Sequence, residues 1–363
     1  MDAPNFALAS YLARSGNAVD LVAYRADEAL LRHPNVKLHR VRKPAHAYTL
    51  GAPLLGVAGL ACAASIARRG GSVIVNGGNC PFPAANWVHY VHAAFKPVVG
   101  RRGWQRAKTA TAHAVSLVTE RIALHAARLI IANSERTRRD VVEHVGVPDD
   151  RVRTVYYGAD PTQFRPPTED ERENARRSLG WTDGRPRVAF VGALGDRRKG
   201  FDTVHEAWRT LCSESSWDAD LVVVGTGEEL PAWQERARQD GIADRVAFLG
   251  FRRDVFQILW ASDALVAPPR YEAYGAGVHE ALCCGLPALV SSTAGVAERY
   301  PPSLQALLLQ DPESAGSLAE SLRRWRGAKA DWQKGVLALS DSLRARDWDV
   351  MARDIVSLCD AVD

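Results

Sequence analysis

One glycine-rich stretch, Arg270 to Pro287 (RYEAYGAGVHEALCCGLP), constrains this chain more than any other part of it. It follows an apolar run, Ala264 to Ala267, that predicts a buried strand. The double proline after this run ends the strand, because proline cannot donate a ladder hydrogen bond. Val278 to Cys284 predicts a helix that stops at Gly285. The sequence therefore predicts a strand that passes through a tight turn into the N-terminus of a helix.

This turn carries groups for two kinds of ligand chemistry. The backbone N–H groups of the turn, from Tyr274 to Gly277, would point at an anion, and Gly275 and Gly277 would let it approach the backbone. Glu272 lies just ahead of the helix and Glu280 lies inside it, and carboxylates accept hydrogen bonds from sugar hydroxyls. The pattern favours a ligand with both phosphates and hydroxyls. The alternative is a buried strand and helix in which Glu272 only caps the helix.

Short apolar runs alternate with helical patterns throughout the second half of the chain. This alternation predicts a parallel, doubly wound α/β sheet. The expected strands cover residues 188–191, 221–224, 246–249, 264–267, 288–290 and 306–309.

Two glycine-containing turns follow the first two of these strands. The first, Gly192 to Gly200, carries Arg197, Arg198 and Lys199, whose charges would neutralise a diphosphate leaving group. A solvated basic loop is the alternative. The second begins at Gly225, in the sequence Gly-Thr-Gly, which is a weak phosphate signal by itself.

The first half of the chain shows a similar but less regular pattern. It opens with an amphipathic helix pattern that ends at Gly16, without the strand that would precede it in a doubly wound fold. The apolar residues 50–66 fit a buried crossover helix better than a membrane span. A strand expected at 87–91 ends on His92, at the edge where open α/β sheets bind ligands. His92 is therefore a candidate cleft residue, and a satisfied core histidine is the alternative.

Charge is divided unevenly between the two halves. Residues 1–160 hold 21 Lys and Arg against 11 Asp and Glu, whereas residues 161–363 hold 25 against 31. A basic first half, with Trp104 among basic residues at 101–108, is expected to meet an anionic partner such as a phospholipid surface. A solvated basic face is the alternative. The six cysteines show no metal-ligand spacing and no signal peptide is recognisable, so we expect a cytoplasmic protein, with peripheral contact at the inner membrane face as an option.

Several ordered stretches resemble the retaining GT-B glycosyltransferases of glycosyltransferase family 4. They are FALASYLARSG, WVHYVHAAF, IIANSERTRRDVV, VYYGADPTQF, FVGALGDRRKGFD, VVVGTGEEL, VAFLGFRRDV and YEAYGAGVHEALCCGLPALVS. The resemblance implies two Rossmann-like, doubly wound parallel-sheet domains that face a cleft. We expect an acceptor-side domain over 1–160, a linker over 161–186, a nucleotide-sugar-binding domain over 187–346, and a C-terminal helix over 347–363 that packs back across the cleft.

The resemblance also implies roles for particular residues. Glu272 resembles the carboxylate that holds the donor sugar, assisted by the backbone of Ala273, Tyr274 and Gly275, and Glu280 resembles the ribose-binding glutamate. Lys199, with Arg198 nearby, resembles the diphosphate-binding cation, Gly225 belongs to the nucleotide site, and His92 resembles the histidine near the anomeric carbon. The implied reaction moves a sugar from a nucleotide diphosphate to a hydroxyl of a glycan, lipid-linked or small-molecule acceptor, with retention, no cofactor and no metal.

Two departures from the family pattern stand out. Ala193 occupies a position where members usually carry arginine, and the first strand with its glycine-rich loop is missing.

Other functions fit less well. A metal-dependent GT-A transferase needs an Asp-x-Asp at the carboxyl end of a strand, whereas Asp218-Ala-Asp220 precedes one. A nicotinamide dehydrogenase needs GxGxxG in its first βα unit, which is not present. A GT-B phosphorylase or epimerase, or a non-catalytic protein that keeps the donor domain, remains an alternative.

Overall fold

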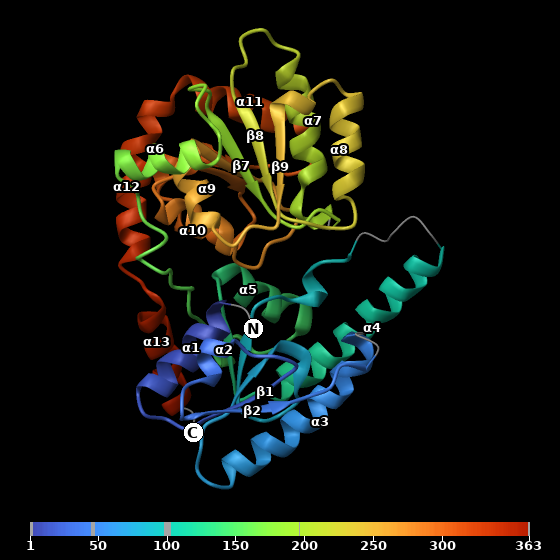
Figure 1. Ribbon diagram of the computed structural model, residues 1–363. Helices are drawn as coiled ribbons and strands as arrows, with labels where there is room; N and C mark the ends of the chain where they lie inside the picture. The colour runs from blue at the N-terminus through green and yellow to red at the C-terminus, as the bar shows by residue number, and fades with distance from the viewer. Residues whose placement is uncertain (1–2, 45–47, 98–102, 196, 362–363) are drawn as a thin grey trace. The chain divides into compact units, whose positions relative to one another are not determined.

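The computed structural model describes residues 3–44, 48–97, 103–195 and 197–361. The described chain forms two compact units: unit 1 comprises residues 1–158 and 346–363, and unit 2 comprises residues 159–345. Residues 161–186 are therefore part of unit 2, and the last helix returns to unit 1. Each unit is an α/β structure with parallel strands (Figure 1).

Unit 2 is built on one six-stranded parallel sheet in the order β12-β11-β10-β7-β8-β9. Its strands are β7 (Arg187–Val191), β8 (Asp220–Val224), β9 (Val246–Gly250), β10 (Ala264–Ala267), β11 (Ala288–Ser291) and β12 (Leu308–Leu309). Its helices are α6 (Glu169–Ser178), α7 (Phe201–Cys212), α8 (Leu230–Gln239), α9 (Val255–Ala261), α10 (Ala276–Cys283), α11 (Ala315–Gly327) and α12 (Lys329–Arg344). The predicted doubly wound sheet is confirmed, although the last strand is shorter than expected because residues 302–307 form a 3-10 helix.

The strand order reverses between β7 and β10, which are neighbours in this sheet. β8 and β9 extend to one side of β7, and β10 to β12 extend to the other. Open α/β sheets bind ligands at such a switch point, outside the carboxyl ends of the strands. The loops after β7 and β10 are therefore the favoured place for a site in unit 2.

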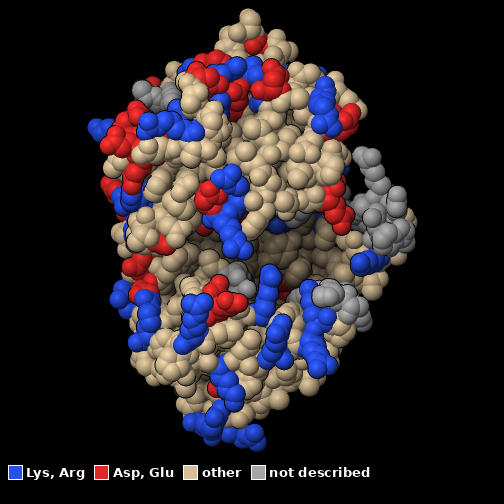
Figure 2. Space-filling model, viewed as in Figure 1, with Lys and Arg blue, Asp and Glu red and all other residues tan. Residues whose placement is uncertain are grey.

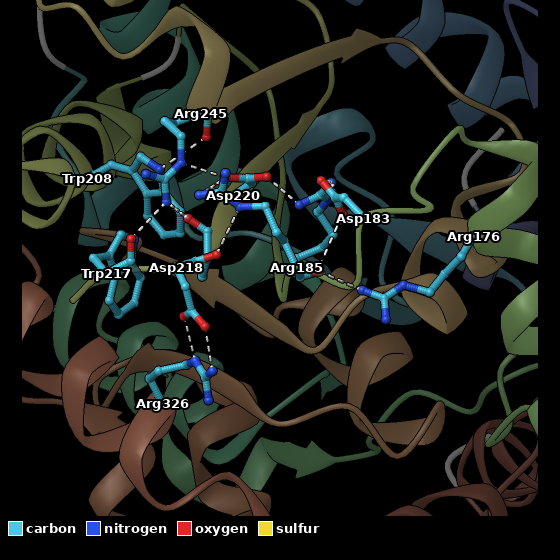
Figure 3. A network of polar contacts seen from close by, with 11 residues as sticks. Arg176, Asp183, Arg185, Trp208, Trp217, Asp218, Asp220, Arg245 and Arg326 are labelled. Atoms are coloured by element: carbon cyan, nitrogen blue, oxygen red, sulfur yellow. Dashed lines mark hydrogen bonds and ion pairs between the residues drawn. The ribbon is translucent and has the colours of Figure 1, made fainter. Parts of the chain in front are cut away.

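At the amino ends of these strands, opposite to the ligand-binding ends, the sheet is held by ion pairs (Figure 3). Asp220 is the first residue of β8, and its carboxylate contacts the guanidinium groups of Arg187 and Arg245. Asp218 accepts two hydrogen bonds from Arg326, at 2.6 and 2.8 Å. Both carboxylates of the Asp-x-Asp sequence thus pair with arginines at the amino end of the strand, where they stabilise the sheet edge.

Unit 1 contains two separate parallel sheets. β1 (Val19–Ala23) pairs with β2 (Val36–Arg40), and a four-stranded sheet has the order β3 (Ile74–Asn76), β4 (Ala85–Val88), β5 (Leu129–Ala132) and β6 (Val152–Thr154). The helices are α1 (Ala3–Arg14), α2 (Glu28–Leu31), α3 (Tyr48–Ala67), α4 (Gly103–Ala126), α5 (Glu135–Asp140) and α13 (Trp348–Asp360). The strand expected at 87–91 is wrong in position, because the chain leaves the sheet after Val88.

Both ends of the described chain meet within unit 1. α1 is the first element among the described residues, and α13 packs against it. Arg14 of α1 donates a hydrogen bond of 2.6 Å to Asp349 of α13. The apolar run at 50–66 lies in α3, which contacts β1. Within the described ranges, no helix combines the length and the apolar character that crossing a bilayer requires.

Candidate functional site

The loop after β7 is fixed against the loop after β10. Arg197 to Lys199 form a short 3-10 turn, and Gly200 follows with a φ of 75° before α7 begins. A Cβ at Gly200 would lie 2.0 Å from the carbonyl oxygen of Pro268. The backbone N–H of Arg270 also donates to the carbonyl of Arg198, at 2.8 Å. These contacts bring the basic turn to the start of the glycine-rich stretch.

The predicted carboxylate and cations of the site lie together. Nζ of Lys199 lies 2.5 Å from Oε2 of Glu272, and the guanidinium of Arg198 lies 3.5 Å from the same oxygen. Arg198 also donates to the carbonyl of Tyr271, at 3.0 Å. The Glu272 side chain is 18% exposed, so this ion pair is largely shielded from solvent screening. The switch point thus carries two cations around one carboxylate.

The turn before α10 is held from behind by residues 295 and 296. The N–H of Gly295 donates to the carbonyl of Glu272 at 3.1 Å, and the N–H of Val296 donates to that of Tyr274 at 2.7 Å. Gly275 has a φ of 109°, and a Cβ there would lie 3.1 Å from Val296. The helix begins at Ala276, two residues earlier than predicted. The N–H groups of Val278 and His279 donate to the carbonyl of Gly275, at 3.1 and 3.0 Å, so an anion would meet the N–H groups just ahead of them.

Two site residues of this turn can offer only their backbone. The side chains of Ala273 and Tyr274 are buried, at 2% and 1% exposure. The hydroxyl of Tyr274 lies 2.8 Å from Nδ1 of His279, inside the unit. The backbone role that the resemblance implies for these residues is compatible with this arrangement.

Glu280 lies on α10, one turn beyond the helix start. Burial raises the pKa of its carboxyl group to about 7. Burial accounts for this shift, and among the described residues no neighbouring cation lowers the pKa of Glu280. A carboxyl group that lacks a cation partner and titrates near neutrality can accept hydrogen bonds from neutral hydroxyls, as a ribose would supply.

The Gly225-Thr-Gly227 turn packs directly on the β7 loop. Gly225 has a φ of 143°, and a Cβ there would lie 1.9 Å from the carbonyl oxygen of Gly192. A Cβ on Gly227 would lie 1.4 Å from the carbonyl oxygen of Leu194. These glycines permit close backbone packing of two loops at the ligand-binding edge, a role that a lone GxG sequence does not reveal.

Phe251 is a feature that sequence reasoning missed. It follows the last residue of β9 and is 70% exposed, although large apolar side chains are usually covered. The sequence does hold one signal for this position, a glycine (Gly250) at the end of a strand, which has a φ of 66° in the structure. An exposed aromatic ring at the carboxyl edge of this sheet offers a flat apolar face to a ligand.

His92 lies in unit 1, at the start of a 3-10 turn beyond β4. The carboxylate of Glu120, on α4, accepts hydrogen bonds from the N–H groups of His92 and Ala93, at 2.8 and 3.0 Å. Burial, followed by the charge of His113, lowers the pKa of His92, so its imidazole is neutral near pH 7. His92 and Glu272 belong to different units, and the structure describes each within its own unit.

Glu120 was not identified from the sequence. It is 2% exposed, and burial raises its pKa despite the two backbone N–H donors. The signal was present, because Glu120 is the one acidic residue in the sequence of the helix from 103 to 126. Its contacts fix the backbone that carries His92.

The alternative for His92 was a core histidine whose ring nitrogens both have hydrogen-bond partners. His89 is a histidine of this kind. Its Nδ1 lies 2.5 Å from the hydroxyl of Tyr157, and its Nε2 lies 2.9 Å from Oδ1 of Asn76. Asn133 donates to the same tyrosine hydroxyl, at 2.9 Å. These contacts tie together the ends of the four-stranded sheet.

Comparisons with known proteins give a consistent result along the chain. A family model described as Glycosyltransferase Family 4 matches residues 5–163, and one described as Glycosyl transferases group 1 matches residues 185–326. An uncharacterized glycosyltransferase of Methanocaldococcus jannaschii is 26% identical over 374 residues, which cover 97% of this chain and 91% of that protein.

Two relatives with more specific names match only in part. The 2-deoxystreptamine N-acetyl-D-glucosaminyltransferase of Streptomyces fradiae is 31% identical over 54% of this chain and 47% of its own length. The D-inositol 3-phosphate glycosyltransferase of Nocardia farcinica is 31% identical over 51% of this chain and 42% of its own length. The chain thus spans about half the length of these two relatives.

Solved structures of similar fold cover nearly the whole chain. WaaG, a glycosyltransferase involved in lipopolysaccharide biosynthesis, superposes with a TM-score of 0.76 at 19% identity, over 98% of this chain and 95% of WaaG. HepE of Anabaena, in complex with UDP-glucose, has a TM-score of 0.73 at 18% identity, over 99% and 96%. At these identities the likeness shows the fold alone.

Proposed function

The chain belongs to the group 1 glycosyltransferases of family 4 and has their GT-B fold, and on this premise we propose that it transfers a sugar from a nucleotide diphosphate to an acceptor hydroxyl with retention of configuration. The observation that carries the proposal is the contact of Lys199 and Arg198 with Glu272 at the switch point of unit 2. The same place holds the start of α10, where an anion would be stabilised.

The ion pair of Glu272 explains how such a site would accept its donor. Without a ligand, the two cations neutralise the carboxylate. A diphosphate carries more negative charge than one carboxylate and competes for both cations. The carboxylate is then free to accept hydrogen bonds from sugar hydroxyls. When the donor binds, the two cations contact the diphosphate and the carboxylate contacts the sugar hydroxyls. Neither the cations nor the carboxylate are then left without a partner.

The proposed transfer breaks the bond between the anomeric carbon and the diphosphate oxygen. The acceptor hydroxyl forms the new bond on the same face of the sugar, and its proton passes to the departing diphosphate. Lys199 and Arg198 stabilise the charge that grows on this leaving group, which is the part a metal ion plays in other transferases. His92, neutral near pH 7, would act as a hydrogen-bonding group near the anomeric carbon.

Substitution of Glu272 tests the proposal. Glu272→Ala is expected to lower turnover by about 100-fold, because the sugar loses its positioning group. Binding of the nucleoside diphosphate, measured by calorimetry, should be retained, since both cations remain. Glu235→Ala is the matched control, because Glu235 is an exposed glutamate of the same unit that pairs with Arg238. Equal turnover of the Glu272 variant and the control would contradict the proposal.

The metal independence of the reaction has its own test. We expect turnover to be the same with and without added Mg²⁺ or Mn²⁺, because the two cationic side chains supply the charge. Turnover that depends on either ion would contradict this part of the proposal.

The comparisons suggest which donor to test first and which classes of acceptor to include. Three structures of HepE hold UDP, UDP-glucose, or UDP and glucose, which supports a uridine diphosphate sugar as the first donor to test. Glycan, lipid-linked and small-molecule acceptors are all proposed, because relatives with small-molecule and lipopolysaccharide names both match. A panel of nucleotide sugars, scored first by donor hydrolysis and then with acceptors, identifies the pair.

We also propose that unit 1 contacts anionic membrane from the cytoplasmic side. On the face that Figure 2 shows, most of the charged side chains of unit 1 are Lys and Arg, whereas unit 2 shows both signs. Exposed apolar side chains lie along single faces of two helices: Leu54, Val57 and Leu60 on α3, and Val115, Val118 and Ile122 on α4.

Vesicle binding tests this contact. Sedimentation with phosphatidylserine vesicles is expected to exceed that with phosphatidylcholine vesicles and to weaken with salt. Equal sedimentation with both lipids would contradict the membrane contact. Residues 101 and 102 of the basic cluster predicted for this contact lie outside the described residues, as do the side chains of 104–106.

A further inference from the structure

Three side chains of different chemistry converge in unit 1, away from the residues described above. They are Asp20 on β1, His39 on β2 and Cys62 on α3. A carboxylate oxygen, an imidazole nitrogen and the thiol sulfur all lie within 4.8 Å of one another. Among the described residues, no other group of three such side chains comes this close.

The register of β1 and β2 explains the convergence. The strands are parallel, with Asp20 opposite Lys37 and Val22 opposite His39. Opposite residues share a face, and side chains two apart in a strand also share it. Asp20 and His39 therefore lie diagonally on one face of the pair. α3, which contacts β1, brings Cys62 to the same face.

We propose that Asp20, His39 and Cys62 form a binding site for a Zn²⁺-type divalent cation. Carboxylate oxygen, imidazole nitrogen and thiolate sulfur are the three donor types that zinc takes in proteins, and three protein ligands leave a fourth position open. A carboxylate and a thiolate together also balance the charge of a divalent cation. This inference goes beyond sugar transfer, because all three residues lie in unit 1, whereas the proposed diphosphate site lies in unit 2.

The site needs only a small rearrangement to take a metal. Nε2 of His39 lies 2.5 Å from Oδ1 of Asp20, which is a hydrogen-bonding distance. Two ligands of one tetrahedral zinc lie roughly 3.3 Å apart, given metal–ligand distances near 2.0 Å. The imidazole and the carboxylate would therefore separate by roughly 1 Å, within the reach of a χ rotation.

Access to the site is open from solvent. The His39 side chain is 36% exposed and that of Asp20 is 21% exposed, while Cys62 is half-buried. A cation can therefore enter without unfolding of the unit. Lys37 and Arg69 lie close enough to act electrostatically on the Cys62 thiol and oppose the cation, so the affinity depends on direct coordination.

The competing account is an ordinary ion pair of His39 and Asp20 with a neighbouring thiol that takes no part. The two accounts differ in what Cys62 does. A coordinating thiol must become a thiolate bonded to the metal, and a bystander does not. The experiment is therefore built on the sulfur.

Cobalt titration of the full chain gives the direct readout. Co²⁺ is a spectroscopic substitute for zinc, and thiolate coordination produces a near-ultraviolet charge-transfer band together with visible bands of tetrahedral shape. We expect the wild-type chain to show both bands with one Co²⁺ per chain, and Zn²⁺ to remove them. Absence of the thiolate band from the wild-type chain would overturn the proposal, whatever the variants do.

Variants assign the band to the three residues. Cys62→Ser is expected to abolish the thiolate band and to weaken Zn²⁺ binding, measured by competition with a chromophoric chelator, by at least tenfold. His39→Asn, which keeps a polar side chain, is expected to weaken it by at least tenfold while retaining sulfur coordination of any Co²⁺ that binds. Cys212→Ser is the control, because Cys212 is also a half-buried free cysteine and belongs to unit 2. A band that survives Cys62→Ser, or that disappears in Cys212→Ser, would place the metal elsewhere and refute the proposal.

Discussion

The six-stranded sheet of unit 2 and the β1–β2 pair of unit 1 differ in how completely they are buried. In unit 2 the central strands β7 and β8 are almost entirely buried and belong to one six-stranded sheet. In unit 1 every residue of β1 is only half-buried, and the β1–β2 pair stands apart from the four-stranded sheet. A fully covered sheet fixes the loops at its edge, whereas a half-covered pair can carry polar groups such as Asp20 on its own face. The six-stranded sheet therefore carries its candidate site on loops, whereas the β1–β2 pair carries polar groups on a strand face.

The largest effect is expected where the loops of unit 2 pack backbone to backbone. In Gly227→Ala, the added Cβ would lie 1.4 Å from the carbonyl oxygen of Leu194, so the two loops must separate. We expect a loss of about 4 kcal/mol in the free energy of unfolding, at the upper end for one substitution, together with loss of nucleoside diphosphate binding. Chemical denaturation and calorimetry measure the two effects.

Gly241→Ala separates this effect from general strain at glycines of the same unit. Gly241 has a φ of 70°, but nothing lies within 4 Å of an added Cβ. Only the cost of the left-handed conformation remains, about 1 to 2 kcal/mol. Equal losses in both variants would show that the loop contact is unimportant.

The second effect depends on pH and arises from Glu280. Its pKa of about 7 in the folded chain exceeds the ordinary value of 4.5, so folding favours the protonated form. This contribution to stability is present below pH 4.5 and is lost as the pH rises through 7. Relative to Glu280→Gln, the wild-type chain should lose about 2 to 3 kcal/mol between pH 5 and pH 8. Denaturation curves of both proteins that shift in parallel would rule this out.

The third effect concerns the cations of unit 2. Lys199→Ala removes a charge-assisted contact with the diphosphate, which we expect to weaken binding by about 1.5 to 3 kcal/mol, roughly 10- to 150-fold. Arg197→Ala serves as a neighbouring control, because Arg197 is 54% exposed and pairs with Asp202. If calorimetry gives the Arg197 variant the weaker binding of the two, the diphosphate contacts have been assigned to the wrong side chain.

The smallest effect is expected in unit 1. Glu120→Gln keeps the side-chain shape but leaves one of the two N–H donors of the His92 turn without its acceptor. We expect a loss of about 1 kcal/mol in stability. Because the turn carries His92, kcat should fall while KM for the donor stays near its wild-type value. A change confined to stability would mean that Glu120 supports the fold and does not position His92.

Sequence reasoning succeeded best where pattern and chemistry coincide. The strands of unit 2, and the placement of Lys199 and Glu272 after strands of the same sheet, follow from short apolar runs that end in glycine and charged residues. The Glu120 carboxylate under the His92 turn and the exposure of Phe251 could not be derived in this way. Both depend on which distant segments pack together, and a single sequence does not state tertiary packing.

Unit 1 is harder to predict for a physical reason. Its strands β1 and β3 are short and mostly half-buried, so the apolar pattern that marks a strand is weak there, and β4 and β5 are fully buried but only four residues long. The strand before His92 was displaced by two residues, and the grouping of Asp20, His39 and Cys62 depends on register and on a helix more than twenty residues farther along the chain. Cysteine spacing alone gave no sign of it.

The pairing of α13 with α1 has a consequence for synthesis on the ribosome. α1 ends at Arg14 and α13 begins at Trp348, so the first helix emerges long before its partner. At elongation rates of about 5 to 20 residues per second, the interval is on the order of half a minute. All residues of unit 2 are translated within that interval. Unit 1 is therefore completed only after all of unit 2 has been translated, and the face of α1 that α13 covers stays open until α13 emerges.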